Sequence, residues 1–233
     1  MSIEVLFEDP DFLVVNKPAG LPVHATVDPL RPHVQGILEK ERREKLVLFH
    51  RLDVETTGVL VFGRNPRINE AMTELFRNKS LESQSSLTKI YWVVVEGRWL
   101  EKDRSVESYI RKVTGGRYLS RPKGSSTEWA KTEFRILKTN GERSWLEARL
   151  VTGRTHQIRL HCSDRGHPVL GDRRYGAKAE RTVEKAFALH CREMSWQHPV
   201  LGNPVRVEAP LPPLWIEQWL KPLGVSDGRR PIT

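Results

Sequence analysis

Short apolar stretches recur along this 233-residue chain, separated by turn-forming residues. Such stretches predict β-strands, because successive side chains of a strand point to opposite faces of a sheet. The strongest is residues 89–96, Lys-Ile-Tyr-Trp-Val-Val-Val-Glu, which Gly97 follows. The predicted strands cover residues 3–7, 12–16, 59–62, 89–96, 105–113, 129–137, 144–151, 186–196 and 205–208.

Apolar residues three and four positions apart predict helices between these strands. The predicted helices cover residues 34–45, 66–78, 155–165 and 214–220. Pro66 suits a helix N-terminus, and Gly166 suits the position just after a helix. Residues 80–88 and 114–126 are expected to be loops, and residues 226–233 a loose tail.

The order of these elements argues for an α+β fold. Strands dominate, and the helices do not alternate with them as they do around a parallel sheet. We therefore predict a largely antiparallel mixed sheet flanked by helices. No stretch rich in Pro, Gly and Ser divides the chain, so a single domain over residues 1–225 is expected.

Composition adds a basic surplus to this picture. The chain has 38 Lys and Arg against 29 Asp and Glu, a formal net charge of +9. The surplus points to a polyanionic partner such as nucleic acid, although a basic protein without such a partner fits equally well. Two cysteines and an acidic N-terminus without a signal sequence predict a protein of the reducing cytoplasm. No apolar run is long enough for a membrane span.

The stretch 50–58 places Asp53 in a turn between two apolar segments. Thr56, Thr57 and Gly58 are turn formers. A charged residue in this position needs a cationic partner or a chemical task. The alternative is that Asp53 only caps a turn.

A second stretch, 152–161, combines a glycine with basic residues at a predicted helix start. Thr155 is expected to cap that helix. Arg154, His156 and Arg159 would surround its N-terminus, where backbone N–H groups and the helix dipole attract anions. The alternative is a basic helix start on the surface.

The strand at 89–96 carries Lys89 and Tyr91 on one face, since strand side chains repeat every two residues. Tyr91 fits either a core position or a platform on which a base stacks. The loop at 114–126 carries Arg117, Arg121 and Lys123, which suit a phosphate contact as well as a solvated hairpin tip.

Other chemistries fit poorly. No glycine-rich dinucleotide or P-loop motif is present. The spacing of His156, His161, Cys162 and His167 matches no zinc pattern, so neither a metal nor a cofactor is expected. Asp53 and Glu55 could suggest a glycosidase pair, but two acids this close are common.

Taken together, the motifs resemble the RluA-type pseudouridine synthases. They occur in order from about residue 5 to residue 210. The matching stretches are 13–24, 50–58, Lys89 with Tyr91, 152–159, 166–176 and 188–192. Thr57 stands where the family usually has serine.

The resemblance implies a pseudouridine synthase fold over one catalytic domain and isomerisation of uridine to pseudouridine in RNA. Asp53 would be the essential carboxylate, either attacking C1′ or taking the C2′ proton. Arg159 would pair with Asp53 and keep it ionised. Tyr91 would stack on the uracil, and Arg51 would fill the space left by the flipped nucleotide or hold a phosphate.

The resemblance also implies that the reaction needs no cofactor and that structured RNA accounts for the positive charge. The residues expected to contact RNA are Arg51, Lys89, Arg154, His156, Arg117, Arg121 and Lys123. The family pattern begins within the first few residues, so no N-terminal S4-type domain is expected. This favours a compact, monomeric enzyme acting on a tRNA or ribosomal RNA stem-loop. The alternative is a non-catalytic RNA-binding protein or RNA chaperone on the same fold.

Overall fold

The computed structural model describes residues 2–77, 87–113, 117–177 and 186–230. The chain divides into two compact units. Unit 1 takes its residues from Met1–Lys89, Val183–Ala186 and His190–Pro210. Unit 2 takes its residues from Ile90–Thr182, Phe187–Leu189 and Leu211–Thr233.

The sheet of unit 1 is built around β4, every residue of which is buried. β4 pairs antiparallel with β2 and β3 and parallel with β10, which also pairs antiparallel with β11. β1 completes this sheet by pairing antiparallel with β2. The strands are β1 (Glu4–Glu8), β2 (Phe12–Lys17), β3 (Val47–Leu48), β4 (Thr57–Gly63), β10 (Leu189–Gln197) and β11 (Pro204–Glu208).

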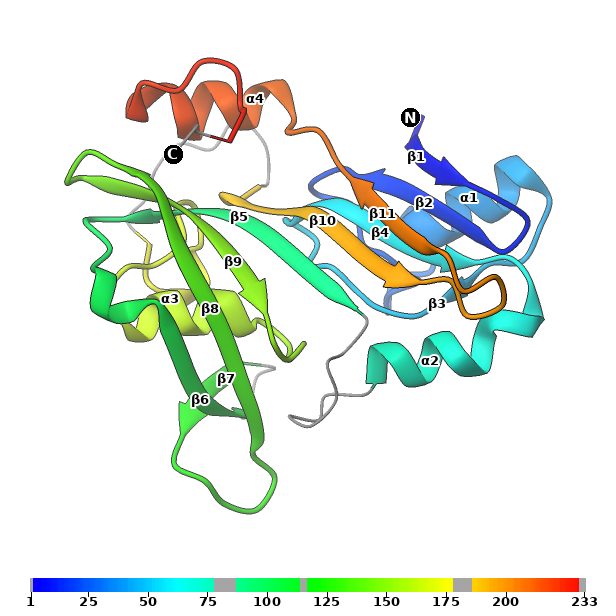
Figure 1. The fold of residues 1–233 in the computed structure, drawn as a ribbon, viewed down its shortest axis with the longest axis horizontal. Helices are drawn as coiled ribbons and strands as arrows, with labels where there is room; N and C mark the ends of the chain where they lie inside the picture. Colours follow the sequence, from blue (N-terminus) through cyan, green and yellow to red (C-terminus); the bar gives the residue numbers. More distant parts are fainter. Residues whose placement is uncertain (1, 78–86, 114–116, 178–185, 231–233) are drawn as a thin grey trace. The chain divides into compact units, whose positions relative to one another are not determined.

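Two helices flank the strands of unit 1 (Figure 1). α1 spans Val34–Arg42 and ends three residues before its predicted end, because Arg43 is left-handed with φ of 56°. A 3₁₀ turn, η1 (Pro66–Ile68), precedes α2 (Asn69–Arg77), and the Asn65 side chain caps the turn. The predicted end of this helix, residue 78, lies outside the described residues.

The sheet of unit 2 is antiparallel, with its strands in the order β5-β9-β8-β6-β7. The strands are β5 (Thr88–Glu96), β6 (Ser105–Lys112), β7 (Tyr118–Arg121), β8 (Glu128–Thr139) and β9 (Arg143–Leu150). The 3₁₀ turn η2 (Glu101–Asp103) precedes β6. Asn140 and Gly141 form the turn between β8 and β9, as predicted, and Gly141 has a φ of +92°.

α3 (Gln157–Asp164) packs against β6, β7 and β8 of unit 2 (Figure 1). The 3₁₀ turn η4 (Arg173–Tyr175) follows it. Near the C-terminus, α4 (Pro213–Trp215), η5 (Ile216–Leu220) and η6 (Lys221–Leu223) form successive helical turns, where the sequence predicts a helix over 214–220. In the predicted tail, Arg230 pairs with Glu147 of β9, and residues 231–233 lie outside the described residues.

The predicted α+β class with a mixed, mostly antiparallel sheet is confirmed. Several predicted boundaries are wrong. The predicted loop 114–126 contains β7, which pairs with β6 from Lys112↔Tyr118 to Tyr109↔Arg121; residues 114–116 lie outside the described residues. Thr88, assigned to the loop 80–88, begins β5, and residues 80–86 are likewise outside the description. β10 starts at Leu189 rather than at residue 186.

Candidate active site

Asp53 lies in a tight turn that leads into β4. The Thr56 backbone N–H donates to the Asp53 carbonyl at 3.1 Å, and the residue as a whole is half-buried. Gly58 follows with a φ of +108°, and a Cβ there would lie 2.2 Å from the Cys191 carbonyl oxygen. Gly58 is therefore required by the close parallel approach of β10, where Cys191 is its register partner.

Lys17 clamps this turn from inside unit 1. Its fully buried side chain donates from Nζ to the carbonyls of Pro18, Val54 and Thr56 at 2.8, 2.9 and 2.8 Å. The Gly20 N–H also donates to the Val54 carbonyl at 2.8 Å. Burial lowers the pKa of Lys17 to about 7, and the nearby carboxylates of Glu55 and Asp53 oppose that shift.

The clamp fixes the backbone that follows Asp53. Three carbonyl acceptors match the three N–H donors of an ammonium group, whereas a neutral amine has only two. The geometry is therefore that of a protonated lysine. One local signal was present in the sequence: Lys17 closes the apolar run of β2 and directly precedes a proline.

His50 and Lys89 flank the same region through Phe76 of α2. The His50 ring stacks on Phe76 with centroids 4.8 Å apart, and Lys89 Nζ lies 4.6 Å from the Phe76 centroid. His50 Nε2 accepts the Val61 N–H at 3.0 Å, so this nitrogen is unprotonated. Burial and the Lys89 charge hold the pKa of His50 well below its ordinary value.

Thr57 uses its hydroxyl to hold a buried histidine. The Thr57 Oγ1 lies 2.7 Å from His190 Nδ1, and His190 Nε2 lies 3.2 Å from the Ala209 carbonyl. Because a carbonyl only accepts, Nε2 carries the proton and Nδ1 accepts the Thr57 hydroxyl. Burial lowers the pKa of His190 to about 3. A serine hydroxyl could make the same bond.

In unit 2, the predicted cap of α3 is wrong. The N-cap residue is His156, in left-handed geometry with φ of 57° and without a side-chain cap bond. Thr155 lies before the helix. The helix start is instead fixed by Gln157, whose Nε2 donates to the Lys131 carbonyl and Thr132 Oγ1, both at 2.9 Å.

Gln157 also accepts from the other side. Its Oε1 receives the Thr152 hydroxyl at 2.7 Å and the Arg154 N–H at 3.0 Å. The four bonds tie the stretch 152–157 to β8. Sequence reasoning missed this role, because it treated Gln157 as an ordinary helix residue.

Arg159 is buried and held from several sides. Its Nε and one terminal nitrogen donate to the two Asp172 carboxylate oxygens at 2.5 and 2.9 Å, and both side chains are at most 5% exposed. The guanidinium carbon lies 4.9 Å from the Tyr175 centroid and 4.5 Å from the Phe187 centroid. The stretch 166–176 therefore supplies both a counter-ion and an aromatic face for Arg159.

The neighbouring basic residues of this stretch have defined partners. Arg154 donates from Nε to the Trp129 carbonyl at 2.9 Å and forms an ion pair with Glu128. His156 Nδ1 lies 2.8 Å from the Tyr175 hydroxyl. These bonds orient the start of α3.

Two further predicted features concern β5 and β7. Tyr91 is 7% exposed and stands opposite Ala148 of β9. Arg117 is exposed just before β7, Arg121 at its end and Lys123 after it.

Arg51 is exposed in unit 1. Asp53 belongs to unit 1 and Arg159 to unit 2, and their pairing stays a prediction.

His161 and Cys162 are structural in this geometry. His161 lies between Thr132 Oγ1, 2.9 Å from Nδ1, and Ser108 Oγ, 3.0 Å from Nε2. Burial lowers the pKa of His161 to about 4 and raises the pKa of Cys162 well above its usual value. A buried thiol of high pKa is a poor nucleophile.

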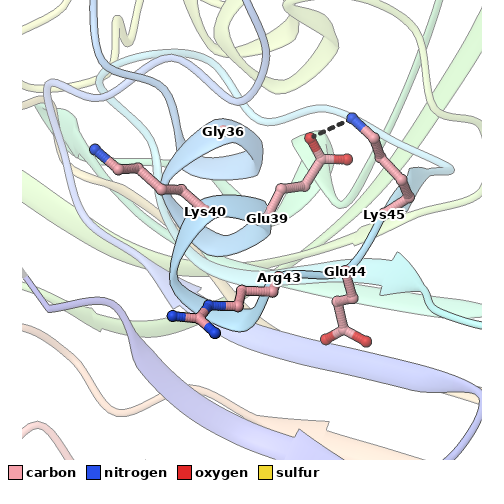
Figure 2. A pocket seen from close by; sticks show the side chains of 6 residues that line it. All are labelled: Gly36, Glu39, Lys40, Arg43, Glu44 and Lys45. Atoms are coloured by element: carbon pink, nitrogen blue, oxygen red, sulfur yellow. Dashed lines mark ion pairs between the residues drawn. The ribbon is translucent and has the colours of Figure 1, made fainter.

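A separate hollow lies beside α1 (Figure 2). It is lined by Gly36, Glu39, Lys40, Arg43, Glu44 and Lys45. Glu39 pairs with Lys45 at 3.8 Å and accepts the Leu46 N–H at 3.0 Å, while Glu44 accepts from Arg64 Nε at 3.0 Å. These contacts hold the turn after α1, and none of the predicted site residues lines the hollow.

Within the described ranges, no three His, Cys, Asp or Glu side chains gather as a metal site would require. None of the helices described has the length and apolar character needed to cross a membrane.

Comparisons with known proteins agree with the motifs. A family model described as RNA pseudouridylate synthase matches residues 11–164. The chain is 33% identical to an uncharacterized RNA pseudouridine synthase of Synechocystis sp., over 91% of this chain and 66% of that protein. It is 33% identical to ribosomal large subunit pseudouridine synthase C of Yersinia pestis, over 89% of this chain and 65% of that protein. The chain thus spans about two thirds of the length of these two relatives.

A solved structure is also similar. Human RNA pseudouridylate synthase domain containing 4 matches with a TM-score of 0.69 and 26% identity, over 91% of this chain and 90% of that one.

Proposed function

The chain belongs to the RNA pseudouridylate synthase family of isomerases, and on this premise we propose that it converts a uridine of tRNA or ribosomal RNA to pseudouridine through Asp53. The observation that carries the proposal is the Asp53 turn, which is clamped by Lys17 through three carbonyls. A carboxylate on a turn held this firmly costs little reorganisation when the substrate binds.

The reaction is an internal rearrangement. The bond between C1′ and N1 breaks, the uracil turns over, and C5 bonds to C1′. C5 then loses its proton while N1 gains one, so the product is an isomer of the substrate. Asp53 either attacks C1′ or removes the C2′ proton, and both routes require it ionised.

Arg159 and Tyr91 complete the proposed catalytic group. Asp172 holds Arg159 through Nε and one terminal nitrogen, and the forked geometry of a guanidinium also suits a carboxylate or a phosphate of the substrate site. A cation opposite Asp53 would favour its charged form. Tyr91, on the rigid strand β5, would stack on the flipped uracil.

The proposed RNA contacts are basic residues of both units. Arg51 neighbours Asp53 in sequence and is exposed, which suits a role beside the flipped nucleotide. The others are Lys89, Arg154, His156, Arg117, Arg121 and Lys123. With a net charge of +9, binding should weaken steeply with salt. The proposal includes a monomer that works in the cytoplasm.

A pair of matched carboxylate variants tests the catalytic assignment. Asp53→Asn should abolish pseudouridine formation and leave RNA affinity within about twofold. Glu55→Gln, two residues away and also half-buried, should retain most activity. The assay is carbodiimide labelling with primer-extension mapping on tRNA and ribosomal RNA transcripts. Pseudouridine made by Asp53→Asn would refute the assignment, and wild-type RNA binding without any product would favour the non-catalytic alternative.

A further inference from the structure

Residues 24–33 form a closed loop just before α1. The loop ends are tied together, because the Val34 N–H donates to the Pro22 carbonyl at 2.9 Å and the Gln35 N–H to the Val23 carbonyl at 3.0 Å. A compact surface loop whose ends meet in this way is an Ω-loop, a form that often carries function.

The tip of this loop is an ordered turn that displays apolar side chains. Asp28 accepts the Leu30 N–H on its carboxylate at 3.0 Å and the Arg31 N–H on its carbonyl at 3.3 Å. Val27 is 103% exposed and Leu30 is 89% exposed. Among the described residues no other large hydrophobic side chain is as exposed; the next is Leu201 at 65%.

Single exposed apolar residues are ordinary on protein surfaces. Val27 and Leu30 differ because they lie on the same turn. The turn is held by its own hydrogen bonds and therefore keeps both side chains in solvent. Asp28 uses its carboxylate within the turn, while Arg31 remains exposed beside Leu30. The tip thus offers an apolar surface with a cation at its edge.

The base of the loop is coupled to the Asp53 turn. The Gly20 N–H bonds the Val54 carbonyl, and the buried residues Leu21, Pro22 and Val23 lead directly from there into the loop. Burial, Arg51 and His33 together lower the pKa of His24. Arg51, two residues before Asp53, is exposed in the same unit.

We propose that loop 24–33 is a second RNA contact of unit 1, in which Val27 and Leu30 pack on unpaired bases beside the target uridine while Arg31 and Arg51 meet backbone phosphates. This inference rests on the proposed function. The cations and the +9 charge favour a polyanion over a second protein as the occupant. Apolar side chains at the tip suit exposed base faces, which a paired helix does not present.

The test compares two double variants of the same composition. Val27→Ser with Leu30→Ser removes the apolar tip. Val200→Ser with Leu201→Ser is the control, because these residues are also exposed on a turn of unit 1 and their bonds to His198 use only backbone N–H groups. The probe is a 5′-labelled RNA hairpin with a seven-nucleotide loop containing uridine. The same strand annealed to its complement is the second probe.

The tip variant should bind the hairpin about tenfold more weakly, with an unchanged salt dependence. The affinity of the tip variant for the duplex should stay within twofold of the wild-type value. The affinity of the control variant for the hairpin should do the same. Arg31→Gln should instead reduce the salt slope by about one. Equal hairpin affinity for wild type and tip variant overturns the inference. It is also overturned if sedimentation shows a dimer for the wild-type protein and a monomer for the tip variant. Failure of the proposed function is separate, because it appears as absent pseudouridine with the wild-type protein.

Discussion

The Asp53 turn and the Arg159 site hold their charged residues by different means. In unit 1, Lys17 reaches three backbone carbonyls, two of them within the Asp53 turn, so the main chain is what is fixed. In unit 2, the Arg159 guanidinium itself pairs with Asp172 and packs against the rings of Tyr175 and Phe187. One site fixes a turn that presents a carboxylate, and the other builds a cation into the core.

This difference has a practical consequence. Loss of the clamp should alter the shape of the Asp53 turn, whereas loss of the Asp172 carboxylate should leave a buried charge without its counter-ion. The two sites should therefore respond unequally to removal of one charged group, and the substitutions below measure that inequality.

The largest effect is expected at the buried ion pair. Asp172→Ala should destabilise the protein by about 3–5 kcal/mol, because the Arg159 charge stays buried after its counter-ion is removed. Urea unfolding followed by fluorescence measures the change. Glu193→Ala is the control, since Glu193 makes the same two-bond fork to Arg206 at 2.9 and 2.8 Å with Arg206 mostly exposed. That variant should lose less than about 1 kcal/mol. Similar losses in both variants would show that burial of the pair is irrelevant.

The second effect is expected at the clamp. Lys17→Met keeps the length of the side chain but removes the ammonium donor from three carbonyls, which should cost about 3 kcal/mol. Pseudouridine formation should fall more than RNA affinity, because the turn that presents Asp53 is disturbed. Lys40→Met, on the exposed side of α1, should change neither. If the Lys17→Met protein keeps wild-type turnover, the clamp has no role in catalysis.

The sequence allowed most strands to be predicted, whereas the catalytic roles of the site residues stay predictions. The apolar runs of β4 and β5 and the Asn140–Gly141 turn are local signals, and they agree with the structure. β7 was missed because its segment is basic and follows two glycines, and only pairing with β6 makes it a strand. Residues 155 and 156 were assigned to α3 because Thr155 is a good capping residue, but the bonds of Gln157 to β8 decide where the helix begins.

The partners of the charged residues were the hardest part to predict. Lys17 finds its carbonyl acceptors 37 and 39 residues later in the chain. Asp172 is one of many acidic residues that could face Arg159, and nothing in the sequence distinguishes it without the resemblance. Such pairs depend on tertiary distance, which periodicity and turn chemistry do not encode.

The pH-dependent effect concerns a buried neutral histidine in each unit. Burial lowers the pKa of His190 to about 3 and that of His161 to about 4, from about 6.5 in an unfolded chain. Below pH 6.5 the unfolded state therefore binds protons that the folded state does not, and stability falls as the pH drops. Each histidine should contribute about 1.4 kcal/mol per pH unit within its window.

The two windows end at different pH values, so the units can be told apart. His161→Gln in unit 2 should flatten the stability profile between pH 6.5 and 4 and leave it unchanged below 4. His190→Gln in unit 1 should flatten the profile down to pH 3, since the pKa of His190 is the lower of the two. Unfolding free energies measured at half-unit intervals give the slopes, and wild type minus variant isolates each proton. Parallel profiles for wild type and both variants would mean that these histidines are not held neutral in the folded protein.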